Sequence, residues 1–443
     1  MRDFAVSDSP AVQAQLDRLE ALSVPQGRLG LEPIRALLAQ LGDPQRRLPP
    51  VFHVAGTNGK GSTCAFLRAA LEAAGQRVHV FTSPHLVRFN ERIRVAGTLI
   101  DDADLAGLLA EALDAAERGN IGISFFEAST AAAFLAFART PADACVIEVG
   151  LGGRLDATNV LERPAVCGVA SLGIDHEAFL LAAEPGTPAD PLTRIAFEKA
   201  GIAKADAPLV TLDYDPRMNE AIAEQARRAG APLIRQGRDW AIRPLPDGFR
   251  YEDARGTLHL PSPGLPGEHQ TTNAALAVAM LRHQHALVIG EPALALGLER
   301  ARWPARLQLL GSGPLTALLP AGTACWLDGG HNPDAGQALA RHFQPAGPRI
   351  HLVIGMLANK DPAGLLGPLG RQLASVTVVP VPGHDWHDRE AFAQIPGIPA
   401  PSTAADVPEA LASLSPAEDE IVLIAGSLYL AGSVLRANGE VPE

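Results

Sequence analysis

The segment at residues 56–62, GTNGKGS, carries the residue types that bind phosphate. It lies between a predicted strand, residues 51–55, and a predicted helix, residues 60–74. Glycines let main-chain N–H groups converge on phosphate oxygens, and the start of the helix adds partial positive charge. Lys60 would neutralise the β- and γ-phosphates, and Ser62 would hold Mg²⁺. The segment departs from the usual G-x-x-x-x-G-K-[ST] pattern, because position 54 is Val and Gly61 precedes Ser62. We nevertheless expect nucleotide binding rather than a plain tight turn.

Acidic side chains follow other strands of the same predicted sheet. Glu148 ends an apolar strand at residues 145–149, and a glycine-rich run, GLGGRLDATN, follows it at residues 150–159. We also expect a strand at residues 171–174 that ends at Asp175 and His176. Ligands of open α/β sheets bind where the strands end. Carboxylates and one imidazole there could hold a metal ion, although His is less usual for Mg²⁺ and an ordinary hydrogen-bonded histidine remains the simpler interpretation.

Lysine is scarce in this chain: there are 33 Arg and only four Lys, at positions 60, 199, 204 and 360. Lys199 lies in EKAGI, which reads as the end of a helix with Gly201 as its stop. A lysine there ordinarily complements the helix dipole. An Arg-rich genome would explain the ratio alone, so the spacing by itself assigns Lys199 no role.

The elements that position these residues alternate between apolar strands and Ala/Leu-rich helices, which is typical of an α/β fold with parallel sheets. Ser124 and Glu127 have the spacing of a capping box and begin a helix at residues 124–140. Turn residues predict a small antiparallel sheet at 240–260. Further predicted elements are a strand at 78–82, helices at 271–285 and 292–301, and strands at 325–327, 351–354, 375–379 and 421–424. We place a domain boundary at Trp303, which gives domains 1–302 and 303–443.

Composition excludes several classes of protein. The formal net charge of -12 argues against a protein that coats nucleic acid, which needs a basic surface. No apolar run approaches the length of a membrane span, and the N-terminus lacks the apolar stretch of a signal peptide. Cys64, Cys145, Cys167 and Cys325 show no close pairing, so we expect buried, reduced thiols in a cytoplasmic protein.

Taken together, these segments resemble the Mur ligase superfamily, and within it the folylpolyglutamate synthase/dihydrofolate synthase family. GTNGKGS is similar to the variant phosphate loop of the superfamily. More discriminating are FTSPHL from Phe81, RFNERI from Arg88 and EVGLGGRLDATN from Glu148. EKAGI, WPARLQ from Trp303, LDGGHNP from Leu327 and GSLYL from Gly426 also match, in order, over residues 30–432.

The resemblance implies a P-loop ATPase domain with a small antiparallel portion, followed by a Rossmann-like C-terminal domain. It implies that the phosphate loop and residues of both domains bind ATP: Thr57, Asn58, Gly59, Lys60, Gly61, Ser62, Asn273, Arg306 and Asp328. Two Mg²⁺ ions would be arranged by Ser62, Ser83, Glu148 and His176. His331 would also line the ATP site, and we count it, with Lys60, His176 and Lys199, among the catalytic residues.

The resemblance also implies a pterin site, formed by Gly30, Leu31, Glu32, Ser124, Phe125, Phe126, Glu127, Leu155, Asp156 and Ala157. Asp156 would hydrogen-bond the amino-pyrimidine edge. Lys199 matches the family lysine that becomes carbamylated, which turns a cation into a carboxylate-like metal ligand. One departure is the long spacing between His176 and Lys199, in which residues 184–191 look like an inserted surface loop. We expect Lys204, His384 and His387 to be solvated, and we leave open whether Lys360 lies near the ATP site.

The implied activity is ATP-dependent formation of an amide between L-glutamate and dihydropteroate or a folate. The substrate carboxylate would be activated as an acyl phosphate, and no protein nucleophile is needed. We expect both reactions and a monomeric enzyme. A monofunctional synthase, a cell-wall Mur ligase, an unrelated P-loop kinase or NTPase, and a nucleotide-sensing protein stay as alternatives. The unrelated kinase or NTPase would not explain the later motifs, and a nucleotide-sensing protein would be expected to lack Glu148 or Lys60, both of which are present.

Overall fold

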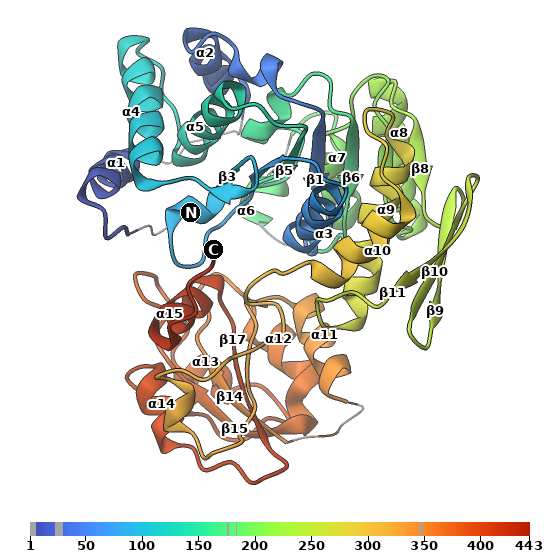
Figure 1. Cartoon of the computed structure of the whole chain (residues 1–443). Helices are drawn as coiled ribbons and strands as arrows, with labels where there is room; N and C mark the ends of the chain where they lie inside the picture. Colours follow the sequence, from blue (N-terminus) through green and yellow to red (C-terminus); the bar gives the residue numbers. More distant parts are fainter. Residues whose placement is uncertain (1–5, 23–29, 175–176, 183, 345–346, 348) are drawn as a thin grey trace. The chain divides into compact units, whose positions relative to one another are not determined.

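The computed structural model describes residues 6–22, 30–174, 177–182, 184–344, 347 and 349–443. The chain divides into two compact units (Figure 1). The large unit consists of residues 1–84, 89–264 and 270–302, and the small unit consists of residues 85–88, 265–269 and 303–443. Each unit is described by itself. No helix among the described residues is both long enough and apolar enough to cross a membrane.

The large unit contains an eight-stranded sheet in the order β4-β3-β2-β5-β1-β6-β7-β8. Its strands are β1 (Val51–Ala55), β2 (Val78–Phe81), β3 (Ile93–Val95), β4 (Thr98–Leu99), β5 (Ala144–Glu148), β6 (Val166–Val169), β7 (Leu209–Thr211) and β8 (Leu233–Arg235). All pairs are parallel except those that join β3 to β2 and β4 to β3. Every residue of β1 and β5 is buried, because helices cover both faces of the sheet.

Register decides which residues meet at the edge of this sheet. Val54 of β1 lies beside Glu148 of β5, one residue before β1 ends. The strands are parallel, so the loop after β1 and the last residue of β5 share one edge. The sequence-based prediction that the phosphate loop and Glu148 lie at the same end of the sheet is therefore confirmed.

The helices of this unit form two groups. α1 (Pro10–Ala21), α2 (Glu32–Gln40), α4 (Asp102–Arg118) and α5 (Phe125–Arg139) pack together around one apolar core (Figure 1). α7 (Pro191–Ala200) and α8 (Pro216–Ala229) pack on β6 and β7 around another. The remaining helices are α3 (Lys60–Ala73), α6 (Glu177–Leu180), α9 (Glu268–His283) and α10 (Glu291–Arg300), with 3₁₀ turns η1 (Pro44–Arg47), η2 (Phe89–Arg92) and η3 (Ala157–Val160).

The predicted antiparallel sheet is present as β9 (Trp240–Leu245), β10 (Gly248–Asp253) and β11 (Gly256–Pro261). The indole of Trp240 stacks on the ring of Tyr251, with their centroids 5.8 Å apart. Arg282 of α9 forms an ion pair with Asp253, whose side chain is fully buried. This pair ties the small sheet to the helix that also carries Asn273.

The small unit is a six-stranded sheet in the order β12-β13-β17-β14-β15-β16. Its strands are β12 (Gln308–Leu309), β13 (Cys325–Leu327), β14 (Ile350–Ile354), β15 (Leu373–Val378), β16 (Ser402–Thr403) and β17 (Ile421–Ala425). Only the β12–β13 pair is antiparallel. α14 (Val407–Ser413) and α15 (Leu428–Asn438) contribute to one apolar core, and α11 (Pro333–Phe343), α12 (Pro362–Leu366) and α13 (Arg389–Ala393) to another, which gives a Rossmann-like unit. The 3₁₀ turns η4 (Thr316–Leu318) and η5 (Gly367–Gln372) complete it.

Three expectations from the sequence are wrong. Residues 171–174 form no strand, because β6 already ends at Val169. Lys204 is not freely solvated, since it is partly buried and its ammonium donates to the Oδ1 of Asn159 at 2.5 Å. His384 and His387 are also partly buried. The His384 ring lies 3.9 Å from that of Tyr429, and the Nε2 of His387 bonds to the carbonyl of Lys360 at 2.8 Å.

The close packing of α10 against α3 yields a stability prediction. A Cβ atom added at Gly297 would lie 2.4 Å from the Cα of Ala70, so Gly297→Ala must push two helix backbones apart. We expect it to lower the free energy of unfolding by about 1–3 kcal/mol, as overpacking does.

Gly107 of α4 provides the matched control, because nothing lies within 4 Å of an added Cβ there. Gly107→Ala should raise stability by about 0.5–1 kcal/mol through helix propensity. Urea unfolding of both variants measures the difference. A Gly297→Ala protein as stable as the Gly107→Ala protein would contradict the contact.

Candidate active site

The phosphate loop is anchored to the segment that follows β6. The main-chain N–H groups of Thr57 and Asn58 donate to the carbonyl of Ser171 at 2.7 and 3.2 Å, and the hydroxyl of Thr57 donates to the carbonyl of Gly173. The carbonyls of residues 171 and 173 thus serve the loop instead of a neighbouring strand. This explains why the predicted strand at 171–174 does not form.

Gly59 is the residue at which the loop turns into α3. Its φ is +82°, a conformation that favours glycine. An added Cβ would lie 2.3 Å from the side-chain oxygen of Asn273, so α9 closes over the loop at this point. Asn273 is buried, and its amide donates to Gln270 at 3.0 Å. The structure therefore brings Asn273 to the loop, and its expected role in nucleotide binding, which the family resemblance implies, stays a prediction.

Charges of both signs lie beside the loop. The Nζ of Lys60 donates to the carbonyl of Thr57 at 3.3 Å. Glu148 is 4% exposed, and its carboxylate accepts from the main-chain N–H of Ser83 at 3.2 Å. Burial raises the pKa of the neighbouring Cys64 thiol; the charge of Glu148 raises it further, and that of Lys60 lowers it. Lys60 and Glu148 thus share one neighbourhood.

Three of the four predicted metal ligands, Ser62, Ser83 and Glu148, are oxygen donors. Ser62 is buried in the first turn of α3, and Ser83 contacts Glu148 through its main chain. The described residues contain no group of three or more His, Cys, Asp or Glu that could hold a metal ion. One carboxylate with hydroxyl oxygens suits Mg²⁺, which commonly completes its shell with substrate phosphates and water. His176, predicted as a ligand and catalytic residue, lies outside the described residues, as does Asp175.

Lys199 reaches the same loop from α7. Its side chain is buried, and its Nζ donates to the carbonyl of Gly56 at 2.9 Å. Lys199 is the last residue but one of α7, and Gly201 follows the helix, as the sequence predicted. The amine therefore lies at the first residue of the phosphate loop.

The residues predicted to bind a pterin gather around α2, α5 and η3. α2 packs against α5 and η3. The predicted capping box is present, since the Glu127 carboxylate accepts from the N–H and the hydroxyl of Ser124, both at 2.7 Å. The Phe126 ring would clash with a Cβ at Gly150, and the Phe125 ring lies 5.4 Å from the Arg92 guanidinium. The other members of this set are Gly30, Leu31 and Glu32 at the start of α2, and Leu155, Asp156 and Ala157 at η3.

Asp156 belongs to a buried hydrogen-bonded chain. Its carboxylate accepts from the N–H of Leu151 at 2.8 Å and from the hydroxyl of Thr158 at 2.5 Å. That hydroxyl also lies 2.8 Å from the Nε2 of His53. Since the Thr158 proton goes to Asp156, the Nε2 of His53 must be the donor. Burial lowers the pKa of His53 to about 3, so its ring is neutral. Burial also raises the pKa of Asp156, and the hydrogen bonds oppose that rise.

In the small unit, Arg306 lies in a strained turn. Its neighbours Ala305 and Leu307 have positive φ angles of 54° and 43°. The turn is held by Asp328, whose carboxylate accepts from the N–H groups of Leu307 and Gly330 at 2.8 and 2.7 Å. Such strain costs about 1–3 kcal/mol per residue and is concentrated at functional sites. Asp328 therefore positions the loop that carries Arg306.

Two histidines, His331 and His269, lie beside the turn that carries Arg306. The Nδ1 of His331 lies 2.9 Å from the carbonyl of Gly329. Burial lowers the pKa of His269. The charge of Asp328 opposes this effect and the charge of Arg306 adds to it, so His269 lies close enough to both residues to belong to this group. The structure thus brings together three predicted residues, Arg306, Asp328 and His331. Sequence reasoning missed His269, whose only signal was its place in the segment that includes Asn273.

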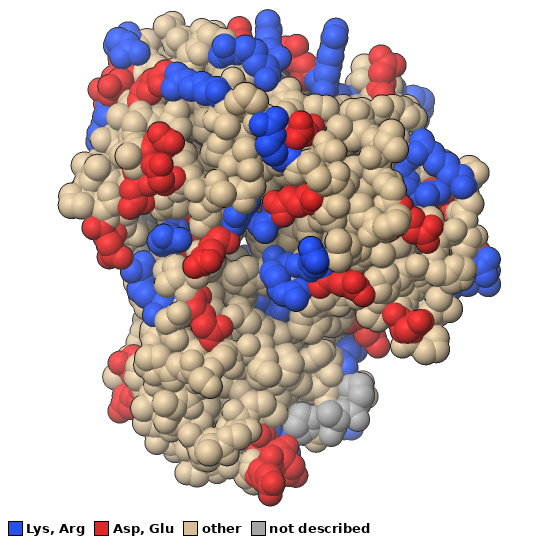
Figure 2. All heavy atoms as spheres, in the orientation of Figure 1, with Lys and Arg blue, Asp and Glu red and all other residues tan. Residues whose placement is uncertain are grey.

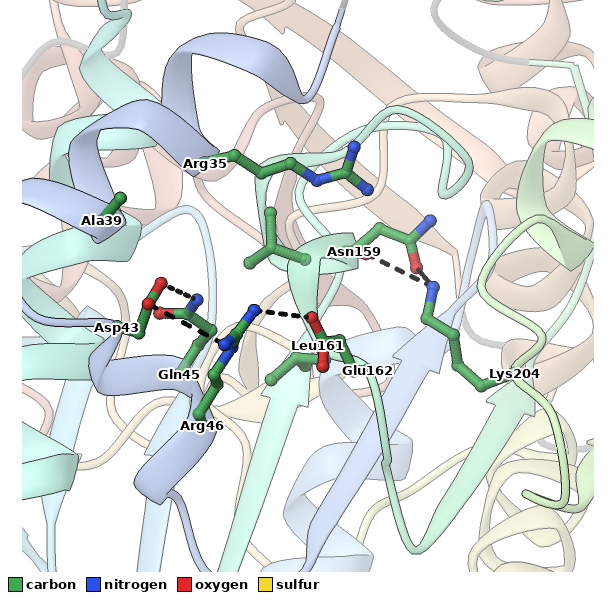
Figure 3. Close-up of a pocket in the computed structure, with 10 residues that line it drawn as sticks. Arg35, Ala39, Asp43, Gln45, Arg46, Asn159, Leu161, Glu162 and Lys204 are labelled. Atoms are coloured by element: carbon green, nitrogen blue, oxygen red, sulfur yellow. Dashed lines mark hydrogen bonds and ion pairs between the residues drawn. The ribbon is translucent and has the colours of Figure 1, made fainter.

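A separate hollow of about 540 Å³ lies beside η3 (Figure 3). It is lined by Arg35, Ala39, Asp43, Gln45, Arg46, Asn159, Val160, Leu161, Glu162 and Lys204. Burial lowers the pKa of Lys204, and the positive charge of Arg35 lowers it further. None of the predicted site residues lines this hollow.

On the face seen in Figure 2, basic and acidic side chains are interspersed.

Comparisons with known proteins agree on one family. Residues 317–437 match the family model described as dihydrofolate synthetase, C-terminal domain. The chain is 38% identical over 354 residues to the dihydrofolate synthase/folylpolyglutamate synthase of Escherichia coli. The aligned region covers 79% of this chain and 77% of the relative. It is 34% identical to the Bacillus subtilis protein of the same name, over 92% of this chain and 94% of the relative.

Solved structures agree. The E. coli enzyme in complex with DHPP and ADP matches with a TM-score of 0.84 and 34% identity, covering 97% of each chain. The Yersinia pestis bifunctional enzyme matches with a TM-score of 0.83 and 32% identity, covering 97% of this chain and 98% of that one. A similar structure was solved with Mn, AMPPNP and L-glutamate bound. Sequence identity and fold, over nearly the whole chain, place this protein in the folylpolyglutamate synthase/dihydrofolate synthase family of ATP-dependent ligases.

Proposed function

We propose that this chain joins L-glutamate to dihydropteroate and to folates, with ATP as the phosphoryl donor. The observation that carries the proposal is the phosphate loop: Gly59 closed over by Asn273, with Lys60, Glu148 and Lys199 beside it. A nucleotide-sensing protein would have no need of a buried carboxylate and a buried amine at this loop.

The residues present fit a nucleotide and a divalent cation. Gly59 has no side chain between the turn of the loop and the Asn273 amide, and Glu148 supplies a buried anion near the loop. We propose that Thr57, Asn58, Gly59, Lys60 and Gly61 hold the phosphates, and that Ser62, Ser83 and Glu148 hold Mg²⁺. When bound, Mg²⁺ neutralises charge between the γ-phosphate and the acceptor carboxylate. Asn273 in the large unit, and Arg306, Asp328 and His331 in the small unit, stay proposed nucleotide-site residues.

The reaction requires no covalent bond between the substrate and a protein side chain. The γ-phosphoryl group passes to the acceptor carboxylate, the bond to the ADP oxygen breaks, and an acyl phosphate forms. The α-amine of glutamate then attacks the acyl carbon and phosphate leaves. This chain must orient two anions, offset their repulsion and exclude water, which suits Lys60 and the main-chain N–H groups of the loop.

At the pterin end we propose that Asp156 accepts from the amino-pyrimidine edge. The order of donors supports this, because His53 donates to Thr158 and Thr158 donates to Asp156. The Thr158 hydroxyl stabilises the ionised carboxylate directly, and His53 orients that hydroxyl, so the carboxylate can accept from a ligand. Ser124, Phe125, Phe126 and Glu127 of α5, with Gly30, Leu31 and Glu32 at α2, are proposed to enclose the ring.

Activity assays decide between this function and its alternatives. We expect phosphate release from ATP with dihydropteroate plus glutamate, and also with tetrahydrofolate plus glutamate. Release with one acceptor alone would show a monofunctional synthase. Release only with a UDP-linked peptide would show a cell-wall ligase, and turnover with no folate-type acceptor would refute the proposal. The predicted monomeric state and cytoplasmic location stay predictions.

Lys199 provides a mutational test. Lys199→Ala and Lys199→Arg should both lower kcat by about 100-fold or more, equivalent to ~2.7 kcal/mol, because neither side chain can carry a carbamate. A small added carboxylate should partly restore activity to Lys199→Ala but not to Lys199→Arg, which leaves no space for it. Arg118→Ala, at an exposed position of α4, is the control. Wild-type kcat in Lys199→Arg would exclude a chemical role for the amine.

Thr158→Val tests the chain that leads to Asp156. Losing the donor should lower kcat/KM for dihydropteroate about 10-fold, mainly through KM. It should also raise the pKa of Asp156, because the hydrogen bond opposes the effect of burial. Since the ionised form binds, the acidic limb of the pH profile should move to higher pH.

Thr377→Val is the matched control, a buried threonine in the sheet of the small unit. Steady-state kinetics from pH 5 to 9 gives both readouts. An unchanged KM and acidic limb in Thr158→Val would argue against Asp156 as the pterin acceptor.

A further inference from the structure

Four charged side chains form a closed ring between the glycine-rich segment and α7. Arg154 pairs with Glu184 at 2.6 Å and with Glu198 at 2.9 Å. Arg194 pairs with the same two carboxylates, at 3.3 and 3.1 Å. Cations and anions alternate around this ring, so its formal charges cancel.

Two members of the ring are buried, whereas the side chains of Arg154 and Glu184 are 24% and 21% exposed. Arg194 is 5% exposed and Glu198 is 4% exposed. The Phe197 ring lies 5.5 Å from the guanidinium of Arg154 and 5.9 Å from that of Arg194. Charges in such surroundings interact strongly, and removing one leaves the others uncompensated. The ring therefore fixes Arg154 and α7 against each other.

Main-chain contacts reinforce this junction. The N–H of Arg154 donates to the carbonyl of Glu198 at 2.8 Å. A Cβ at Gly153 would lie 2.8 Å from the carbonyl oxygens of Glu198 and Lys199, and a Cβ at Gly201 would lie 2.4 Å from the Cβ of Arg154. Glycine at both positions thus permits the segment and the end of α7 to touch.

Asn159 closes the same junction from the other side. Its amide donates to the carbonyl of Arg154 at 2.9 Å and to that of Gly201 at 3.1 Å, while its Oδ1 accepts from Lys204. These contacts cross-link the segment to the residues that follow α7 (Figure 3 shows Asn159 and Lys204). The junction is held on both sides of residue 199.

Lys199 follows Glu198 directly. Successive residues of a helix point about 100° apart, so anchoring the 194/198 face fixes the direction of the Lys199 side chain. That side chain ends on the carbonyl of Gly56 in the phosphate loop. Rotation or sliding of α7 would move the amine away from the loop.

We propose that the ring of Arg154, Glu184, Arg194 and Glu198 is a positioning device that holds Lys199 at the phosphate loop. Its effect on catalysis rests on the function proposed above, whereas its effect on the Lys199 amine does not. These four are positioning residues, because their ion pairs join them to one another and not to a reacting group.

The test uses Arg154→Lys, which keeps the charge and loses the two-pronged guanidinium, together with Glu198→Gln and Glu184→Gln. Arg139→Lys is the matched control. Arg139 also makes a two-pronged pair, with Glu111 at 2.8 and 2.6 Å, but at an exposed site. Since Glu198→Gln removes a buried charge and can fail to fold, Arg154→Lys and the rim variant Glu184→Gln carry the test in that case.

Two readouts are measured. Kinetics should show kcat lowered at least 10-fold in Arg154→Lys and Glu198→Gln, with the KM for ATP and dihydropteroate changed less than 2-fold. NMR of protein labelled with ¹³C at the Cε of its four lysines gives one signal for each. The signal that disappears in Lys199→Arg belongs to Lys199. That signal should shift in the ring variants, the Lys60 signal should stay in place, and Arg139→Lys should change neither readout.

The outcomes separate the two proposals. Ring variants with wild-type kcat and an unmoved Lys199 signal would overturn the positioning role. Lowered kcat with an unmoved Lys199 signal would also overturn it, because the loss would then be general. A wild-type protein without ligase activity would defeat the proposed function, and the Lys199 signal would still decide the inference.

Discussion

The site depends on the parallel pairing of β1 with β5. That pairing sets Val54 beside Glu148, so a phosphate-binding loop and a buried carboxylate emerge from adjacent strands at one edge. A shift of one residue would turn the Glu148 side chain to the other face of the sheet. Apolar side chains on both faces of β1 and β5 prevent such a shift, since both strands are buried throughout. Hydrophobic burial thus fixes the position of a charge.

Segments distant in sequence then complete the loop. The carbonyls of residues 171 and 173 hold its first part, Asn273 covers Gly59, and the amine of Lys199 reaches Gly56. The contacts of residues 171, 173 and 56 use carbonyl groups that a regular strand or helix would have satisfied internally. An irregular loop leaves main-chain groups that its own backbone does not pair, and the cost of burying them unpaired explains why several elements must stabilise one short loop.

The sequence predicted the strands better than it predicted which distant residues form hydrogen bonds and ion pairs with each other. β1, β5 and the strands β13, β14, β15 and β17 of the small unit are short apolar runs, whose burial favours strands in an α/β fold. The capping box of α5 was predictable because its partners are three residues apart. Residues 171–174 are also apolar, but long-range hydrogen bonds to Thr57 decide their conformation. Lys204 was misassigned for the same reason, since its partner Asn159 is brought near only by the fold. The motifs named candidate site residues, which stay predictions, but did not reveal the ring around Arg154, because charge spacing along a chain does not show which charges pair in the fold.

The scarcity of lysine acquires a physical meaning in these contacts. Lys60, Lys199 and Lys204 each donate to a carbonyl or amide oxygen, whereas the ring that fixes α7 is built from arginines. A guanidinium is a rigid fork that suits two carboxylates, and an ammonium is a compact donor on a flexible stem. In a chain whose composition favours Arg, a pairing role is readily filled by Arg. A lysine places a single nitrogen at the end of a flexible stem, and at position 199 that nitrogen is buried beside the phosphate loop.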